Sequence, residues 1–180
     1  MYDIKALYEA ENVQDAIRLL TEHPQAQIIA GGSDVLVQIR EGKRAGVELV
    51  SIYGLDELRG VSLEEDETLR IGSLTSFSHI TKNELIQKYI PVLGEAVDMV
   101  GGPQIRNIGT IGGNTCNGVT SADSASTLFA LDAIIELTGP EGIRRLPIRE
   151  FYIKAGKVDI RQGELQTGIL IPKQSYQGYR

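Results

Sequence analysis

Two adjacent glycines, Gly31-Gly32, stand between a short apolar run and a helical pattern, and this junction constrains the fold most strongly. The run over residues 27–30 reads as a buried strand that the glycine pair ends. Ser33 or Asp34 can cap the helix that follows, and residues 47–52 form a second strand. Because strand–helix–strand crossovers usually pair their strands in parallel, we expect a small parallel unit here.

The chain is expected to divide near residue 55. Residues 1–55 form an N-terminal subdomain that contains this unit and a helix beginning after Asn12. Residues 56–175 form a second subdomain, a mixed sheet with helices, so the fold class is α+β. In it we expect a hairpin on either side of residues 64–67, helices from about 76 and over 90–100, an irregular loop system over 101–126, a helix over 124–131, and strands over 133–138, 143–146 and 165–171.

The charge and hydropathy of the chain limit its ligands and its location. A net charge of −6 and a pI near 5.0 argue against nucleic-acid binding, which needs a basic stripe. Because no long Lys/Arg run occurs, cofactor phosphates must be held mainly by backbone N–H groups. The sequence has no apolar signal region and no run of about eighteen apolar residues. We therefore expect a cytoplasmic protein that does not insert into a membrane.

The scarcity of soft metal ligands excludes several redox centres. One cysteine, Cys116, and two histidines, His23 and His79, cannot form a disulfide framework, a zinc site or an iron–sulfur cluster within this chain. No cationic residue adjoins Cys116, so we expect a packed, inert thiol. His79 reads as a helix-face residue, and the acidic run 64–67 as a solvated hairpin tip that lacks the order of a calcium loop.

The first glycine segment, Ala30-Gly31-Gly32-Ser33-Asp34, suits an anionic ligand. Glycine permits positive φ and lets a ligand approach the backbone without a Cβ in the way. Successive N–H groups in such a turn form an anion-binding nest, and the following helix start adds a positive partial charge. A plain strand-to-helix turn explains the same residues. The spacing does not fit G-x-G-x-x-G, so a Rossmann site is not supported.

The second glycine segment, Gly109-Thr110-Ile111-Gly112-Gly113-Asn114, is expected in a loop. Its hydroxyl, amide and glycines suit a polar ligand, and Asp123 suits a ribose hydroxyl. Local turns that satisfy the loop backbone are the alternative. Arg106, the nearby basic residue, either assists phosphates or faces a partner. We also expect Gly112→Val to abolish cofactor retention and to leave the fold largely intact.

Four motifs in order carry a family resemblance: Ala30-Gly31-Gly32-Ser33-Asp34, Gln104-Ile105-Arg106-Asn107, Thr110-Ile111-Gly112-Gly113-Asn114 and Ser121-Ala122-Asp123-Ser124. They resemble the FAD-binding family of molybdopterin dehydrogenases, which holds the FAD subunits of bacterial xanthine dehydrogenases and the medium subunits of carbon monoxide dehydrogenases. The similarity runs from Met1 to about Pro172. It implies the two-subdomain FAD-binding fold of the p-cresol methylhydroxylase and vanillyl-alcohol oxidase type.

The resemblance also implies a site and a role. The two glycine segments would embrace the FAD pyrophosphate, Asp123 would meet the ribose or adenosine side, and the backbone near Leu165 would approach the ring system. The implied cofactor-binding residues are Ile28, Ile29, Ala30, Gly31, Gly32, Ser33, Asp34, Gly101, Gly109, Thr110, Gly112, Gly113, Asn114, Asp123 and Leu165, and no residue is implied to be catalytic. The implied module passes electrons from an iron–sulfur subunit, beside a molybdopterin subunit, through FAD to NAD in a xanthine dehydrogenase-type molybdenum hydroxylase.

Two other functions fit the same residues. One is a non-redox binding or assembly module that holds no flavin, and the other is a stand-alone flavin oxidoreductase of the same fold. Family members usually continue into a C-terminal subdomain that is absent from this sequence, which suggests either a truncated chain or a separate partner polypeptide. The sequence of this module does not distinguish among a purine, nicotinate, an aldehyde and carbon monoxide as the substrate of the complex.

Overall fold

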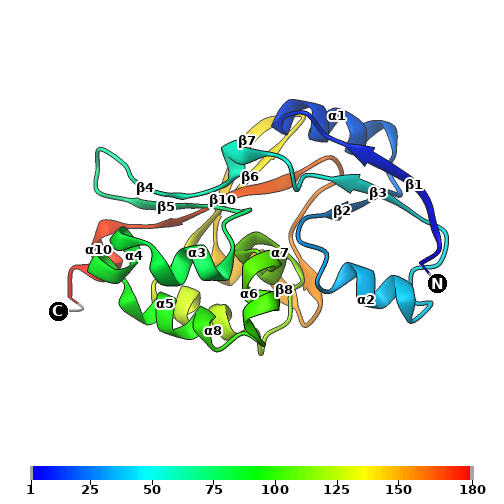
Figure 1. Cartoon of the computed structure of the whole chain (residues 1–180). Coiled ribbons are helices and arrows are strands. Elements are labelled where there is room, and N and C mark those ends of the chain that lie inside the picture. Colours follow the sequence, from blue (N-terminus) through cyan, green and yellow to red (C-terminus); the bar gives the residue numbers. More distant parts are fainter. Residues whose placement is uncertain (1, 179–180) are drawn as a thin grey trace.

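The computed structural model describes residues 2–178 and builds its N-terminal part on a parallel sheet (Figure 1). The strand order is β1 (Ile4–Glu9), β3 (Val47–Ser51) and β2 (Gln27–Ile29), with both pairings parallel. The predicted strand–helix–strand unit is therefore confirmed. Strand β1 was not predicted, because it is an edge strand with mostly exposed side chains and carries no clear apolar pattern.

Two helices lie on opposite sides of this sheet (Figure 1). Helix α1 (Val13–Glu22) begins after Asn12, whose side-chain oxygen accepts a hydrogen bond from the Asp15 amide at 2.9 Å, as predicted. Its apolar stripe packs Ala16 and Leu20 into the core. Helix α2 (Val35–Arg40) follows the first glycine segment, and the side chain of Asp34, its N-cap residue, makes no capping hydrogen bond.

The second sheet has five antiparallel strands and confirms the predicted hairpin and closing strands. In spatial order they are β4 (Val61–Leu63), β5 (Leu69–Gly72), β10 (Leu165–Ile171), β6 (Ile134–Gly139) and β7 (Gly142–Pro147). Strand β10 lies at the centre and is buried along its whole length. It therefore fixes the position of the residues just before and within its N-terminal end.

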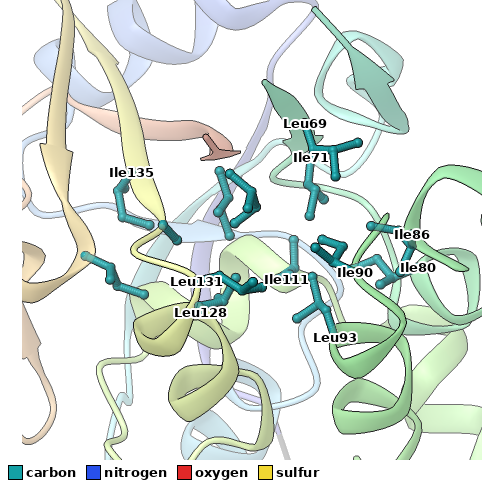
Figure 2. Packing of buried hydrophobic residues seen from close by; sticks show 14 of the residues in the cluster. Leu69, Ile71, Ile80, Ile86, Ile90, Leu93, Ile111, Leu128, Leu131 and Ile135 are labelled. Atoms are coloured by element: carbon teal, nitrogen blue, oxygen red, sulfur yellow. The ribbon is translucent and has the colours of Figure 1, made fainter. Parts of the chain in front are cut away.

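Helices cover one face of this sheet and enclose the main core (Figure 1). They are α3 (Phe77–Lys82), α4 (Glu84–Tyr89), α5 (Pro91–Asp98), α6 (Pro103–Ile108), α7 (Ile111–Cys116) and α8 (Asp123–Ala130). Figure 2 shows Leu69 and Ile71 of β5 facing Leu93 of α5 and Ile111 of α7. Each buried side chain of this size stabilises the folded state by about 1.5–3 kcal/mol.

The prediction of an irregular loop over residues 101–126 was wrong. Helix α6 begins at a proline that suits its first turn, and α7 begins after Thr110, whose hydroxyl caps it. Helix α7 contains two glycines, and each disfavours a helix by about 1 kcal/mol, so the sequence did not predict a helix there. Contacts of α7 with the rest of the fold offset this cost. Likewise α4, separated from α5 by the N-terminal proline of α5, was not predicted.

Shorter elements complete the fold. They are η1 (Asp56–Leu58), α9 (Ile148–Phe151), β8 (Tyr152–Lys154), β9 (Lys157–Val158) and α10 (Lys173–Tyr176). The segment between β9 and β10 returns to the N-terminal part, where the Gln162 amide donates to the Leu20 carbonyl at 2.8 Å. Leu165 packs in the same apolar cluster as Ala16 and Leu20. The two parts therefore share a core, and a subdomain boundary near residue 55 stays a prediction.

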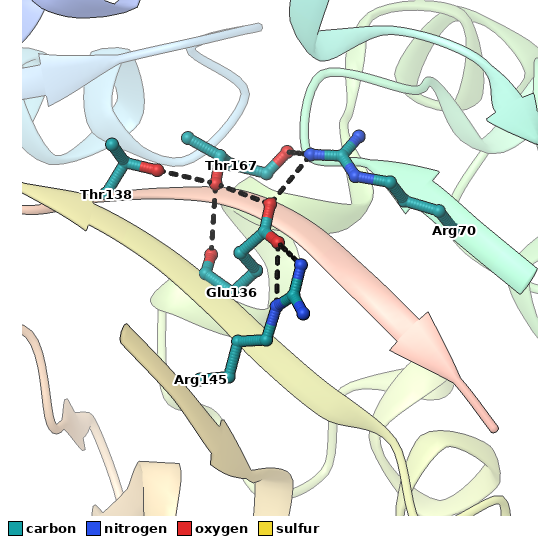
Figure 3. Close-up of polar contacts among 5 residues, drawn as sticks. All are labelled: Arg70, Glu136, Thr138, Arg145 and Thr167. Carbon is teal, nitrogen blue, oxygen red and sulfur yellow. Dashed lines mark hydrogen bonds and ion pairs between the residues drawn. The ribbon is translucent and has the colours of Figure 1, made fainter. Parts of the chain in front are cut away.

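The other face of the five-stranded sheet carries a polar network centred on Glu136 (Figure 3). Glu136 is 4% exposed and accepts hydrogen bonds from Arg70 at 2.8 Å and from Arg145 at 2.8 Å and 3.0 Å. Thr167 donates to the same carboxylate and contacts Thr138. The network joins β5, β10, β6 and β7 across the sheet.

No helix within residues 2–178 is long and apolar enough to cross a membrane.

Candidate functional site: a cavity between the two glycine segments

A cavity of about 540 Å³ lies between the N-terminal sheet and the part of the second half formed by α7 and β10. Its volume falls within the range of about 300–1,000 Å³ typical of small-molecule sites. Both glycine segments line it. Of the predicted residues, the lining includes Ile28, Ala30, Gly31, Gly32, Ser33, Asp34, Gly109, Thr110, Gly112, Gly113, Asn114 and Leu165. The fold thus brings together residues that lie more than a hundred positions apart in the chain.

Gly31 contacts the residue just before the second glycine segment. A Cβ at this position would lie 1.8 Å from the carbonyl oxygen of Ile108, far inside van der Waals contact. Gly32 has φ +73°, a conformation that favours glycine. The first glycine therefore permits close approach, and the second permits the sharp turn from β2 into α2.

The first glycine segment presents a run of free backbone donors at the cavity wall. Within the part of the chain that the structure describes, the amides of Gly31, Gly32, Ser33 and Asp34 have no hydrogen-bond acceptor. Four consecutive free amides at a cavity wall suit a phosphate or other anion. The expectation of an anion-binding turn is therefore consistent with the local geometry.

The second glycine segment is built differently, because its backbone amides are used within the protein. The Ile111 amide donates to Thr75, and the Gly112 amide to the carbonyl of Ser73 at 2.9 Å. The Gly113 amide donates to the Thr110 hydroxyl at 3.1 Å. This segment therefore contributes close backbone approach and side-chain groups to the cavity, and few free main-chain donors.

The role expected for Gly112 needs correction. A Cβ at this position would lie 2.6 Å from the Cβ and 2.7 Å from the carbonyl oxygen of Ser73. A side chain there would push α7 away from the β5–α3 connection, so the expectation that Gly112→Val leaves the fold intact was wrong. Gly113 is exposed at the cavity, and a Cβ there would meet only the Thr110 hydroxyl, at 3.0 Å.

Three predicted residues do not line the cavity. Ile29 lies behind Gly32, and Gly101 is exposed with φ +46° beside Ile105. Asp123 is exposed at the start of α8. The next residue, Ser124, donates to the Asn114 side-chain oxygen at 2.5 Å, so α8 positions Asn114. The role of these three residues in cofactor binding stays a prediction.

Arg106 is held by the protein itself. Its guanidinium donates to the Gly101 carbonyl at 2.9 Å and pairs with Asp98 at 3.2 Å, so it ties α6 to the end of α5. The basic residues that do line the cavity are Arg44 and Arg161, which the sequence analysis did not single out. Arg44 is held by the Gln27 and Gln38 side-chain oxygens at 2.7 Å and 2.5 Å and has no carboxylate partner among residues 2–178.

Two buried polar atoms on cavity-lining residues have no partner in the described chain. They are the hydroxyl oxygen of Ser73 and the amide nitrogen Nε2 of Gln166. Unpaired buried polar groups are uncommon and destabilising, so their position marks a wall that suits a polar ligand. No sequence pattern separates Ser73 and Gln166 from ordinary strand residues, and neither was predicted.

Cys116 also lines the cavity, next to Gln166. Burial raises the pKa of the Cys116 thiol to about 12, and this outweighs the opposing effect of Thr115. The thiol is therefore protonated at neutral pH, which agrees with the prediction of an inert cysteine. Among the described residues, no three potential ligands are grouped as a metal site would require.

An α+β fold with a run of free amides at the wall of a large cavity is suited to a phosphate-bearing cofactor. Comparison with known proteins identifies the cofactor and the family. The chain belongs to the family of FAD-binding domains in molybdopterin dehydrogenases, whose pattern matches residues 2–174. FAD is therefore the cofactor of this domain.

Individual relatives agree with this assignment. The chain is 42% identical over 174 residues to the xanthine dehydrogenase FAD-binding subunit of Escherichia coli O157:H7, covering 97% of this chain and 60% of that subunit. It is 32% identical over 166 residues to the carbon monoxide dehydrogenase medium chain of Afipia carboxidovorans, covering 92% and 57%. A crystal structure of Cu,Mo-CO dehydrogenase superposes with a TM-score of 0.91 at 31% identity, covering 96% and 60%. The chain thus spans about three fifths of these relatives.

Proposed function

We propose that this chain is the FAD-holding module of a xanthine dehydrogenase-type molybdenum hydroxylase, and that the FAD pyrophosphate lies on the amides of Gly31 to Asp34. The observation that carries this proposal is the run of four free amides at the cavity wall. Hydrogen bonds from uncharged donors to a phosphate are charge-assisted and stronger than neutral ones. An acidic chain can therefore hold two phosphates without a lysine cluster.

Other residues at the cavity wall have different proposed roles in holding FAD. Arg44 adds a positive charge beside Gln27 at the cavity wall, at the start of β2. Asn114, whose side-chain oxygen accepts from Ser124, has its amide nitrogen left as a donor. Leu165 closes the cavity from the β10 side. We assign Gly109 to Asn114 the role of holding the cofactor by close backbone approach rather than by main-chain donors.

The proposed role in the complex follows from the relatives. Their names describe FAD-binding subunits and medium chains of dehydrogenases, which supports an oxidoreductase complex with separate subunits. We propose an iron–sulfur subunit and a molybdopterin subunit as partners, and a fold of the p-cresol methylhydroxylase and vanillyl-alcohol oxidase type. When bound, FAD would supply the redox chemistry that relays electrons from iron–sulfur clusters to NAD. The chain itself supplies position and hydrogen bonds.

A flavin titration tests this proposal. The purified chain, freed of flavin, is titrated with FAD and separately with riboflavin, while flavin fluorescence and visible absorption are recorded. We expect FAD to bind far more tightly than riboflavin, since only FAD carries the pyrophosphate. A chain that takes up no FAD would contradict the proposal and favour a non-redox assembly module. Turnover of a small donor without any partner protein would instead favour a stand-alone flavin oxidoreductase.

A further inference from the structure

The Gln166 side chain occupies an unusual position between β10 and α7. It lies in the central strand and is 4% exposed. Its oxygen Oε1 accepts a hydrogen bond from the Cys116 thiol at 3.0 Å and lies 2.9 Å from the Thr115 hydroxyl, whose single proton is shared with the backbone carbonyls of Ile111 and Gly112 at 3.1 Å each. Adjacent side chains of α7 therefore contact one end of this amide.

The other end of the amide has no partner. The nitrogen Nε2 is buried and bonds to no acceptor among the described residues, although it carries two N–H groups. Native proteins seldom bury such a group without a partner, and the exceptions commonly mark a bound molecule or a functional group. Gln166, Cys116 and Leu165 all line the cavity, so the unpaired donor belongs to a side chain of its wall.

The Cys116 thiol supports this orientation of the amide. Burial keeps the sulfur protonated at neutral pH, so the thiol has a proton to donate and Oε1 is the acceptor beside it. With the oxygen engaged by α7, the nitrogen is left without a partner among the described residues. The single cysteine of the chain thus has a structural use that requires no redox chemistry.

We propose that Gln166 is an FAD-binding residue whose Nε2 donates a hydrogen bond to an acceptor atom of the cofactor, and that Thr115 and Cys116 are positioning residues that orient it. This inference rests on the proposed function, because it requires FAD in the cavity. FAD offers acceptors along its whole length, in the ring carbonyls and nitrogens, the sugar hydroxyls and the phosphates. Gln166 would select for a ligand that places one of these acceptors at the β10 wall.

The first test compares Gln166→Met with the matched control Gln87→Met. Methionine keeps the length of the side chain and removes the amide, while Gln87 lies on α4, is exposed and does not line the cavity. We expect the dissociation constant for FAD to rise about three- to tenfold in Gln166→Met, the range for one lost hydrogen bond, and to stay unchanged in Gln87→Met. Thermal unfolding without FAD confirms that both variants fold.

A second variant, Gln166→Glu, tests the direction of the hydrogen bond and guards against misfolding of the first. A carboxylate has no donor to offer an FAD acceptor, so affinity should fall about tenfold or more near pH 8. It should recover as the pH is lowered to about 5, because burial raises the pKa of a carboxyl group and the protonated form again donates. The wild-type chain should lack this recovery. Repeating the titrations with ADP and with FMN shows which half of FAD carries the acceptor.

The outcomes separate the two proposals. A wild-type chain that binds no FAD overturns both. A wild-type chain that binds FAD, together with unchanged affinity in Gln166→Met, overturns only the Gln166 assignment. Affinity in Gln166→Glu that equals or exceeds the wild-type value at every pH would show that the amide accepts rather than donates, and would overturn the proposed orientation.

Discussion

Gly31 and the carbonyl group of Ile108 approach so closely that a Cβ on Gly31 would lie 1.8 Å from the Ile108 oxygen. This contact joins the connection between β2 and α2 to the C-terminal end of α6. The first glycine segment is therefore in direct contact with the residue just before the second, and a side chain at Gly31 would have to displace that backbone.

The Gly31–Ile108 contact predicts the effect of Gly31→Ala. The added methyl group must separate the two segments, so we expect a loss of about 1–3 kcal/mol in the free energy of unfolding. Urea denaturation measures this loss, and FAD affinity should fall with it. Gly54→Ala is the control, because a Cβ at Gly54 meets nothing within 4 Å. Equal stability of the two variants would show that the segments can move apart without cost.

Gly112 and Gly113 are neighbours in α7 and should respond differently to alanine. Gly112→Ala should destabilise the fold, because its methyl group meets the Ser73 backbone. Gly113→Ala should leave stability near the wild-type value, since alanine favours a helix and only the Thr110 hydroxyl must shift. Its methyl group should still weaken FAD binding by occupying space at the cavity. Thermal unfolding and FAD titration of both variants test these expectations, and normal FAD binding by Gly113→Ala would contradict the placement of Gly113 against the cofactor.

Arg44 should contribute to FAD affinity through its charge. Arg44→Gln removes the cation at the cavity wall, so affinity should fall and should also depend less on ionic strength. Arg40→Gln on α2 is the control, because Arg40 is exposed and does not line the cavity. Titrations at low and high salt make the comparison. A salt dependence that is the same in wild type and Arg44→Gln would show that Arg44 does not interact with the FAD phosphates.

The Glu136 network predicts how stability depends on pH. Burial opposes the charge of Glu136, but the hydrogen bonds from Arg70 and Arg145 outweigh it and hold the pKa of Glu136 below its ordinary value. Because the folded pKa is lowered, the contribution is complete above the unfolded value of about 4.3 and is lost as the pH falls through the folded value.

Glu136→Gln should therefore cost about 3 kcal/mol at neutral pH, where it leaves two arginines without their carboxylate. The cost should shrink under acid conditions, where wild-type Glu136 becomes protonated. Urea unfolding at pH 7 and at about pH 3 measures both values. A cost that is the same at the two pH values would mean that the charge of Glu136 does not stabilise the sheet.

The sequence predicted most of the second sheet, the parallel N-terminal unit and both glycine segments, because these rest on local periodicity and on glycine at turns. It failed where distant residues decide. Helix α7 forms although it contains Gly112 and Gly113, since its packing on Ser73 and Gln166 outweighs their poor helix propensity. Gln166 and Arg44 gained significance only when the fold placed them at the cavity. The expected ligand contacts and the cytoplasmic location stay predictions.

The central claim, that the amides of Gly31 to Asp34 hold the FAD pyrophosphate, is tested most directly by NMR of the ¹⁵N-labelled chain. Spectra are recorded without ligand, with saturating FAD and with saturating riboflavin, which lacks both phosphates. We predict that FAD shifts the amide resonances of Gly31, Gly32, Ser33 and Asp34 strongly downfield and that riboflavin does not. Resonances that stay in place when FAD is bound, or that move equally with riboflavin, would contradict the account.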